Sequence, residues 1–539
     1  MTVRAEPFLQ RREANFQPLS PVRFLARENE AHPERCAIVW RDLRFNYAEF
    51  NTMAVRLAER IAQAGIGAGD VVSIIARNRP EMLAAHFAVP SLGAVLNTLN
   101  TRLDAAALSY ILAHSQSRLL IVEQAVSDAA LQAASTAGVT VLVLSDPDAR
   151  KKGDTPSLLS GDTDPGAVLD ESMVTDEWQP VCLNYTSGTT GEPKGVVYHA
   201  RGAFLNAMGN ALSLGFGAST RYLWTLPMFH CNGWSHTWAV TAAGGTHVCL
   251  DGIEPAAILD HITRHEVTHM ACAPVVLYML LNDTGAQSLR GSGKRVSVAT
   301  GGAAPTATLI ASLSEMGFDL THLYGLTESY GPASICELAD DMADADPAEK
   351  ARWLSRQGAR HKTSGSIRIV DPETGADQPA DGLSSGEILL RGNTVMAGYH
   401  RDLDATEAAF RDGWFHTGDI AVREPDGAIR ITDRAKDVII SGGENISSLE
   451  VESVLHKHPA VLIAAVVAMP SEKWGETPCA FVECKPGTAV DEAEMAAFCR
   501  DHLAGFKVPR KFIFSEVPKT ATGKIQKFRL REQARGLGA

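Results

Sequence analysis

The stretch Tyr185–Val196, YTSGTTGEPKGV, combines residue types that are suited to holding phosphate. Its glycines let the backbone approach an anion closely, and its hydroxyl and amide groups are neutral donors. The spacing differs from the GxxxxGK[ST] loop, because Lys194 follows Pro193 and precedes Gly195. We therefore expect no helix to begin at this lysine and no following hydroxyl to hold magnesium. Taken alone, the stretch is as compatible with a flexible turn as with a phosphate site.

Three further motifs carry groups for nucleotide and acyl chemistry. LYGLTES (Leu323–Ser329) contains an aromatic ring at Tyr324, suited to stacking on a base, and a carboxylate at Glu328, suited to a metal. HTGD supplies Asp419, whose carboxylate suits two vicinal ribose hydroxyls, and PKTATGKIQK presents Lys524 on a glycine-bearing turn. Each motif alone has an ordinary explanation: a core tyrosine, a turn or a solvated lysine. Their combination and order favour a functional interpretation.

A histidine and a tryptophan in LPMFHCNGW form a candidate acid-binding pair. His230 and Trp234 are four residues apart, so they share one face if the segment is helical. The alternative is a buried histidine beside a core tryptophan.

Short apolar runs alternate with helical patterns in the first half of the chain. DVVSIIA (Asp70–Ala76) is typical of a strand, and the helical pattern after it begins at Pro80, where proline is tolerated. LDAAALSYILAHSQS predicts a helix with Asp104 near its start, and GVTVLVLS (Gly138–Ser145) predicts another buried strand. This alternation predicts an α/β fold, with parallel sheets flanked by helices in a large N-terminal domain.

The pattern changes after Gly386. GEILLRG, DGWFHTGDIAVREPDG and AIRITDR are short strands separated by Gly and Asp-Gly turns, which predict a small β-rich subdomain. The last hundred or so residues mix helical and strand patterns and are long enough for a core of their own. We expect an N-terminal domain at 1–432, a hinge at 433–437 and a small mobile α+β domain at 438–539.

The composition bounds the function classes. The 539 residues carry a net charge of −13, which argues against nucleic acid or a membrane surface as partner, because both are anionic. Nine scattered cysteines without a CxxC pair favour a reducing compartment. No apolar run reaches the ~18 residues of a membrane span, no secretory signal is apparent, and RGLGA at the end is no peroxisomal address. A cytoplasmic protein is expected.

The motif series YTSGTTGEPKG, YGLTE, TGD, DRAKD with SGGEN, and PKTATGK resembles the adenylate-forming superfamily of acyl-CoA synthetases, adenylation domains and luciferases. The resemblance covers nearly the whole chain. LPMFHCNGW resembles the corresponding segment of short- and medium-chain acyl-CoA ligases. It is most similar to that of the bacterial 3-methylmercaptopropionyl-CoA ligases of dimethylsulfoniopropionate breakdown and of plant enzymes of similar sequence.

The resemblance implies an ATP site. Lys194 would follow the departing pyrophosphate, Thr327 would contact the α-phosphate, and Lys524 would bridge the α-phosphate and the attacking carboxylate. Mg²⁺ would lie near Thr186 and Glu328. The implied ATP-binding residues are Thr186, Ser187, Gly188, Thr189, Thr190, Gly191, Lys194, Gly302, Ala303, Ala304, Pro305, Tyr324, Gly325, Thr327, Asp419, Arg434 and Lys524.

The resemblance also implies sites for the acid and for coenzyme A. His230 and Trp234 would border the acyl group, with Gly301, Gly325, Gly331 and Pro332 as the opposite wall. The C-terminal domain would swing about Lys436, withdraw Lys524 and bring in the passage for pantetheine. The residues implied there are Lys436, Ser441, Gly442, Gly443, Glu444 and Trp474.

The expected function is therefore an AMP-forming acid–CoA ligase, with ATP, a small carboxylic acid and coenzyme A as substrates. Lys524, Thr327, Glu328 and His230 are the expected catalytic residues. Trp234 is large and favours a short pocket, suited to 3-methylmercaptopropionate, butyrate, hexanoate or benzoate. The alternatives are a ligase that loads a carrier protein or releases acyl-AMP, and a non-catalytic nucleotide-binding regulator. A homodimer is expected.

Overall fold

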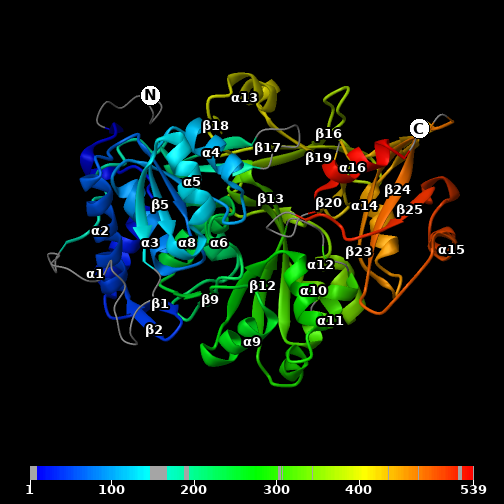
Figure 1. Cartoon of the computed structure of the whole chain (residues 1–539), viewed down its shortest axis with the longest axis horizontal. Helices are drawn as coiled ribbons and strands as arrows, with labels where there is room; N and C mark the ends of the chain where they lie inside the picture. The colour runs from blue at the N-terminus through cyan, green and yellow to red at the C-terminus, as the bar shows by residue number, and fades with distance from the viewer. Residues whose placement is uncertain are drawn as a thin grey trace.

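The computed structural model describes residues 9–145, 167–186, 193–301, 305, 307–342, 344–434, 436–442, 444–471, 473–519 and 525–537. The strands of this described part form four sheets, which helices separate or cover (Figure 1). Three of the sheets consist of residues before Lys436, and the last is built from residues after it.

One large sheet, here called the β13 sheet, is mostly parallel. Its strands in spatial order are β15 (Ala359–Arg360), β14 (Gly331–Cys336), β13 (Phe318–Leu326), β12 (Val296–Thr300), β11 (His269–Cys272), β9 (Arg221–Leu223), β10 (Thr246–Cys249), β1 (Cys36–Trp40) and β2 (Leu43–Asn46). β11, β12 and β13 run parallel, so their carboxyl ends lie at one edge, the usual place for a ligand in such a sheet.

The other large sheet, the β7 sheet, has a parallel centre and an antiparallel edge. Its order is β18 (Gly398–Tyr399), β8 (Lys194–His199), β7 (Pro180–Thr186), β4 (Val95–Thr98), β3 (Val71–Ile75), β5 (Ser117–Glu123) and β6 (Thr140–Leu144). The expected parallel pairing is therefore confirmed for the centres of the large sheets, whereas their edges are antiparallel. β7 and β8, like β13 and β14, are joined by short connections, and a parallel pair would need a longer crossover.

A layer of helices lies between the two large sheets. It contains α1 (Val22–Ala31), α2 (Tyr47–Gln63), α3 (Pro80–Ser91), α6 (Ala200–Ser213) and α8 (His236–Ala242). α2 packs on β1 and β2, its neighbour α3 packs on β3, β4 and β7, and α6 contacts both β8 and β14. The main apolar core fills this layer, with Phe50, Phe87, Trp224 and Trp238 fully buried.

Further helices cover the outer faces. α4 (Ala105–His114) and α5 (Asp128–Ala137) pack on the β7 sheet. α9 (Pro255–Arg264), α10 (Pro274–Asn282), α11 (Ala307–Glu315) and α12 (Pro347–Leu354) lie on the β13 sheet, at the bottom of Figure 1. The chain thus alternates helix and sheet through its N-terminal part, which confirms the α/β class.

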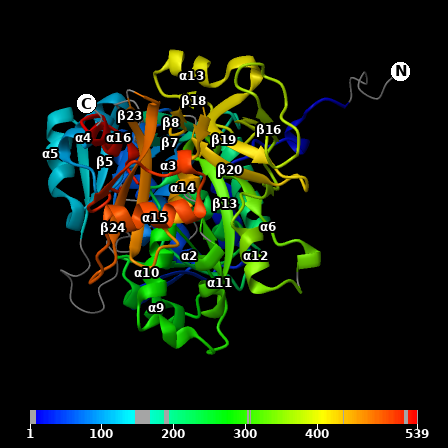
Figure 2. The ribbon, with the colours of Figure 1, turned by 90° about the vertical axis from the view of Figure 1, so that its right-hand side faces the viewer.

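Two smaller sheets complete the fold. The β19 sheet is antiparallel, in the order β16 (Ser366–Val370), β17 (Ser385–Arg391), β19 (Phe415–Arg423) and β20 (Ile429–Arg434). The C-terminal sheet contains β22 (Glu444–Ile446), β21 (Ile439–Ser441), β24 (Gly475–Cys484), β23 (Val461–Ser471) and β25 (Lys511–Phe514), with α14 (Ser448–Leu455), α15 (Glu492–His502) and α16 (Lys527–Arg535) around it. Turned by 90°, the molecule shows these C-terminal elements in front of the large sheets (Figure 2).

Local signals position several elements as expected. α3 begins at Pro80, and Asp104 caps α4 by accepting a hydrogen bond from the Ala107 amide at 2.8 Å. The strand near 138–145 is present as β6, but the expectation that it is buried is wrong. β6 is the edge strand of its sheet, and Val143 is half exposed.

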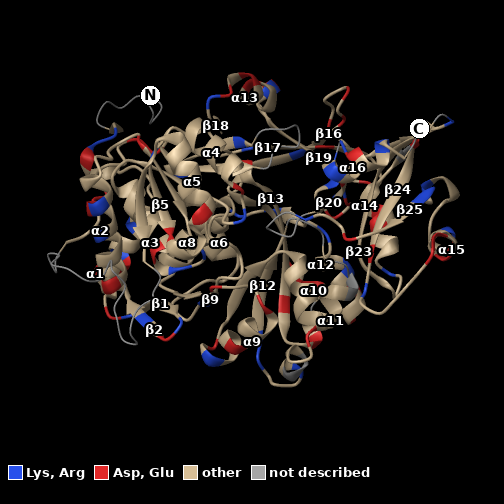
Figure 3. Ribbon diagram, in the orientation of Figure 1, with Lys and Arg blue, Asp and Glu red and all other residues tan. Residues whose placement is uncertain are grey.

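Charged residues of both signs are interspersed over the ribbon (Figure 3). Among the described residues, every helix is too short or too polar to cross a lipid bilayer.

Candidate active site

The carboxyl end of β13 lies against both the β7 sheet and the β19 sheet. Tyr198 on β8 donates a hydrogen bond to the Thr327 carbonyl at 2.6 Å and so joins the two large sheets. Tyr324 on β13 donates to Asp419 Oδ2 on β19 at 2.9 Å and so joins the third. Residues from distant parts of the sequence are thereby held in one site.

The nucleotide end of this site contains Tyr324, Asp419 and Arg434. Asp419 and Arg434 are paired across β19 and β20, and the Arg434 Nε lies 3.2 Å from Asp419 Oδ1. Asp419 is only 4% exposed, so its carboxylate depends on these two partners and on its ligand. Burial, together with the Asp419 charge, raises the pKa of Tyr324 far above its usual value, so the phenol stays a donor.

A second carboxylate holds the turn that carries Asp419. Glu387 on β17 accepts from the Gly418 amide at 3.0 Å and lies 2.8 Å from His416 Nδ1. The HTGD turn is therefore fixed from the strand beside it, although sequence reasoning missed Glu387.

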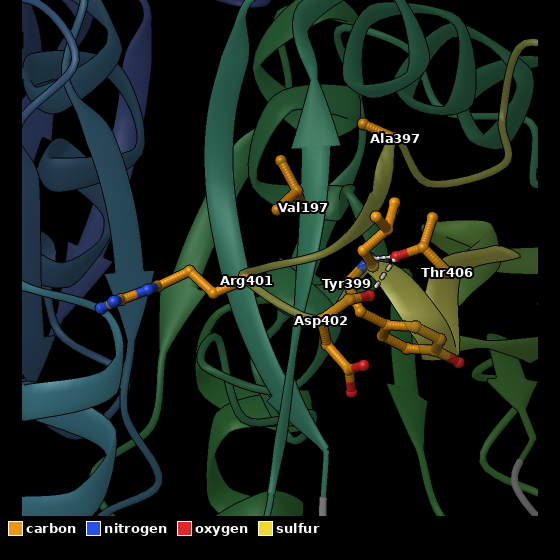
Figure 4. A pocket seen from close by; sticks show the side chains of 8 residues that line it. Val197, Ala397, Tyr399, Arg401, Asp402 and Thr406 are labelled. Carbon is orange, nitrogen blue, oxygen red and sulfur yellow. Dashed lines mark hydrogen bonds between the residues drawn. The ribbon is translucent and has the colours of Figure 1, made fainter.

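The phosphate end brings Lys194 and Glu328 together through Tyr399. Tyr399 donates to Glu328 Oε1 at 2.8 Å, and the Lys194 Nζ lies 4.9 Å from the centre of the Tyr399 ring. The same ammonium is 3.8 Å from Asp402 Oδ2. Beside them is a pocket of about 500 Å³, in which the Arg401 side chain points away from the Tyr399 ring (Figure 4). Its lining is Val197, Ala397, Gly398, Tyr399, Arg401, Asp402, Leu403 and Thr406.

The donor types at this end fit a magnesium ion that is shared with a nucleotide. Thr186 at the end of β7 lies opposite Lys194 in the strand register, and Glu328 follows β13. A hydroxyl and a carboxylate are the hard oxygen ligands that Mg²⁺ takes, usually with substrate phosphates and water. Among the described residues there is no cluster of three His, Cys, Asp or Glu that would form an all-protein metal cage.

The residues predicted to bind the acid pack closely around Trp234. A Cβ added to Gly301 would lie 3.2 Å from the Trp234 ring, and one added to Gly331 would lie 3.1 Å from Trp234 Cβ. Gly325 and Pro332 face each other across β13 and β14, and a Cβ at Gly325 would overlap the Gly331 carbonyl. The structure brings together these residues as the sequence predicted, and glycine is needed where the walls approach.

Trp234 is positioned by an unusual backbone. Cys231, Asn232, Gly233, Trp234 and Ser235 have φ values of 45°, 44°, 57°, 54° and 62°, which form a left-handed turn, labelled α7 (Cys231–Trp234). The segment is therefore not a right-handed helix, so the condition under which His230 and Trp234 would share one face is not met. An L-residue in this conformation costs roughly 1–2 kcal/mol, so the surroundings must hold the turn. Asn184 donates to the Asn232 side chain within it.

Two residues for which the sequence predicted a catalytic role, His230 and Thr327, lie near this turn. Cys231, the residue after His230, lies with its Sγ 3.2 Å from Thr327 Oγ1. His230 and Thr327 are both half-buried, and Pro305 lies buried after β12. Through this contact, the turn that carries Trp234 lies beside Thr327, the residue before Glu328.

The candidate coenzyme A residues lie in the C-terminal sheet. The Gly442 amide donates to the Trp474 carbonyl at 2.8 Å, and a Cβ at Gly442 would lie 2.9 Å from the indole. Ser441 pairs with both Glu444 and Gly475. Trp474 is 42% exposed, and the Lys473 ammonium lies 4.7 Å from the centre of its ring.

The connection to the C-terminal part contains a buried polar network. Asp433 on β20 accepts from the Ser448 amide and hydroxyl at the start of α14, and Lys527 lies 2.6 Å from the Ser448 hydroxyl and 2.8 Å from Glu452. Burial raises the pKa of Asp433, although its donors oppose this. Lys436, three residues further on, is exposed.

Several of the expected site residues lie outside the described residues. They are Ser187, Gly188, Thr189, Thr190, Gly191, Gly302, Ala303, Ala304, Gly443 and Lys524.

Comparison with known proteins identifies the family. Residues 25–400 match the AMP-binding enzymes, and residues 450–524 match the AMP-binding enzyme C-terminal domain. The fold is similar to ATP-bound MatB from Rhodopseudomonas palustris, with a TM-score of 0.84 and 27% identity over 96% of this chain and 100% of that one. The chain therefore belongs to the AMP-binding enzymes, the adenylate-forming superfamily.

The relatives with similar sequences identify the class of enzyme within this superfamily. A 2-methylpropanoate–CoA ligase of Humulus lupulus is 43% identical over 98% of both chains. An acetate/butyrate–CoA ligase of Arabidopsis thaliana, named as peroxisomal, is 41% identical over 97% of this chain and 96% of its own. The protein is an AMP-forming acyl-CoA synthetase.

Proposed function

We propose that this synthetase activates a short carboxylic acid, 3-methylmercaptopropionate or an acid of similar size. The position of Trp234 carries the proposal, because its indole fills the space between Gly301 and Gly331. Sulfur–aromatic contacts of ~0.3–1.5 kcal/mol would favour a thioether acid. The names of relatives as ligases of acetate, butyrate and 2-methylpropanoate support the short-chain class.

In the proposed first step, the acid carboxylate attacks the α-phosphate of ATP and pyrophosphate leaves. Tyr324 covers the adenine, with residues 302–305 opposite, and Asp419 and Arg434 hold the ribose. Residues 186–191 bind the β- and γ-phosphates and Lys194 follows the leaving pyrophosphate. The Lys194 contacts with Tyr399 and Asp402 support this, because they keep the ammonium at the phosphate end.

Mg²⁺, held by Thr186 and Glu328 with the phosphates, would supply Lewis-acid neutralisation of phosphate charge. Tyr399 holds Glu328 in place through its hydrogen bond. Thr327 contacts the α-phosphate, His230 borders the acyl carbonyl, and Lys524 bridges the two reacting anions.

In the proposed second step, the C-terminal domain at 438–539 rotates about the hinge at 433–437 relative to residues 1–432. Lys524 leaves, and Ser441, Gly442, Gly443 and Glu444 line the passage for coenzyme A beside Trp474. A tight passage at Gly442 suits pantetheine, because any side chain there would meet the indole.

A hinge variant tests this rotation. Lys436→Pro fixes φ near −65° at the pivot, so we expect thioester formation to fall at least about tenfold further than adenylation, equivalent to ~1.4 kcal/mol. Single-turnover assays of each half-reaction measure this. Lys436→Ala keeps the backbone free and serves as the matched control. Equal losses in both steps would count against the hinge.

An acid panel tests the short pocket. The wild-type enzyme should prefer acids of up to about six carbons, whereas Trp234→Ala should raise kcat/KM for octanoate relative to butyrate by roughly 10–100-fold, because each methylene is worth ~1–3 kcal/mol. Pyrophosphate release with acetate to decanoate, 3-methylmercaptopropionate and benzoate, with and without coenzyme A, gives the profile.

The matched control is Trp178→Ala, which removes a half-exposed tryptophan that stacks on His199. Its acid profile should equal that of the wild type. A wild-type preference for acids of ten or more carbons would refute the short pocket.

The assembly and location are proposed as a homodimer in the cytoplasm. Light scattering of the purified protein and fractionation of its source cells test the two statements.

A further inference from the structure

Two buried asparagines on α6 connect the opposite walls of the acid pocket. Asn210 Nδ2 donates to the Trp234 carbonyl at 2.8 Å and to Asn206 Oδ1 at 2.9 Å. Asn206 Nδ2 in turn donates to the Pro332 carbonyl at 3.3 Å. The two side chains are 0% and 1% exposed and lie one helical turn apart, so they face the same way.

The carbonyls they hold lie in or next to backbone with positive φ. Trp234 lies in the left-handed turn, where a strained backbone persists only if its surroundings determine it. Pro332 follows Gly331, whose φ is 100°. The asparagines therefore link the left-handed turn to the start of β14 through one regular helix, and a rigid helix sets the distance between them.

Burying asparagine side chains at these positions costs free energy. Asn210 Oδ1 is buried without a hydrogen-bond partner within the described part of the chain, and so are the neighbouring Ser235 Oγ and His236 Nε2. Burial lowers the pKa of His236 to about 3, so this imidazole is neutral near pH 7. The favourable contribution of Asn210 comes from the two hydrogen bonds that it donates.

We propose that Asn206 and Asn210, here called the asparagine bridge, are positioning residues that fix the width of the acid pocket and so determine which acids are accepted. The inference rests on the proposed acid site between Trp234 and Pro332. Neither asparagine needs to touch the acid. The bridge fixes the distance between the Trp234 carbonyl and the Pro332 carbonyl, because each accepts a hydrogen bond from one of two asparagines that lie one turn apart on α6.

If the bridge positions the acid pocket, removing it should weaken binding of the acid without weakening binding of ATP. Asn210→Leu keeps the number and branching of the side-chain heavy atoms but removes both N–H donors of Nδ2. We expect KM for butyrate to rise about tenfold and the preference for butyrate over octanoate, as a ratio of kcat/KM, to fall about tenfold, the effect of roughly one hydrogen bond. KM for ATP should stay at the wild-type value, because the nucleotide end is held by Asp419 and Arg434.

The matched control is Asn51→Leu. Asn51 on α2 is also buried, also donates through Nδ2 to a carbonyl, that of Ala167 at 2.9 Å, and also has an unpartnered Oδ1 among the described residues. It should lower the melting temperature without changing the acid preference. If both leucine variants left the preference unchanged, or both changed it, the asparagine bridge would be refuted as a specificity device.

A double variant separates the bridge from two independent contacts. Either Asn206→Leu or Asn210→Leu breaks the connection, so the double variant should change the butyrate/octanoate ratio no further than one of them does. Additive changes would overturn the bridge. Trp234→Ala separates a failure of the bridge from a failure of the proposed acid site. If Trp234→Ala alters the acid preference while the asparagine variants do not, the acid site is supported and the bridge is refuted. If it has no effect, the acid site itself is wrong.

Discussion

Replacing Lys524 by alanine is expected to slow acyl-adenylate formation by ~10²–10³-fold or more, which corresponds to roughly 3–4 kcal/mol of transition-state stabilisation. A carboxylate must approach an α-phosphate that is already anionic, so part of the barrier is repulsion between like charges. A cation at the point where the two anions meet lowers that barrier, and Lys524 is the residue to which we assign this role. Thioester formation from preformed acyl-adenylate should survive, because the repulsion no longer exists in that step.

The two half-reactions are measured separately, the first as pyrophosphate release and the second as coenzyme A acylation from synthetic acyl-adenylate. Lys519→Ala is the matched control. Lys519 belongs to the same C-terminal segment, but its ammonium is paired with Glu483 at 2.8 Å. It should leave both rates near wild type. Equal losses of both half-reactions in Lys524→Ala would mean that the lysine is not specific to the first step.

Replacing Asp419 by alanine is expected to raise KM for ATP by ~10²-fold. Hydrogen bonds to a charged group contribute ~1.5–3 kcal/mol each, and the carboxylate is proposed to hold two ribose hydroxyls. The change also removes the acceptor of the Tyr324 hydroxyl and the partner of Arg434. The KM for the acid should change much less, because the acid pocket is formed by other residues.

A deoxynucleotide makes this test specific. The wild-type enzyme should discriminate between ATP and 3′-deoxy-ATP, and Asp419→Ala should lose that discrimination, since the group that reads the hydroxyl is gone. Asp377→Ala is the control, because Asp377 is also paired with an arginine, Arg368 at 2.7 Å, but on the exposed edge of the same sheet. Retained discrimination in Asp419→Ala would show that the ribose is held elsewhere.

The sequence was sufficient for features that depend on local chemistry. Pro80 and Asp104 mark helix starts because proline lacks an amide hydrogen and aspartate accepts from free amides, whatever the rest of the chain does. The Gly and Asp-Gly turns after Gly386 likewise predicted a small β-rich subdomain, which is present as the β19 sheet. Such signals need no knowledge of distant residues.

The left-handed turn at 231–235 could not be predicted in the same way. Asn232 and Gly233 tolerate positive φ, but Cys231, Trp234 and Ser235 ordinarily avoid it. Contacts from Asn184 and Asn210, up to 48 positions away in sequence, hold the segment in place. Spacing alone therefore favoured a right-handed helix, and tertiary contacts overrode it.

Sequence reasoning also missed residues that act by holding another side chain or backbone group in place. Tyr399, Glu387 and the asparagine bridge occur in stretches with no unusual composition. They are recognised only when the structure shows Tyr399 against Glu328 or Asn210 against Trp234. β6 was misjudged for a related reason, because its position at the edge of a sheet is a property of the topology.

The contact between Asp433 and Ser448 has a consequence for regulation. Arg434, the proposed ribose ligand, is the next residue along β20, so one strand connects the nucleotide site with the first turn of α14. A rotation about Lys436 would have to exchange the Asp433–Ser448 contacts for others. By thermodynamic reciprocity, if a ligand shifts β20 toward one arrangement, a chain that already has this arrangement binds the ligand more tightly. ATP and AMP share a ribose but differ in phosphate. Each of them would then favour one orientation of the C-terminal domain.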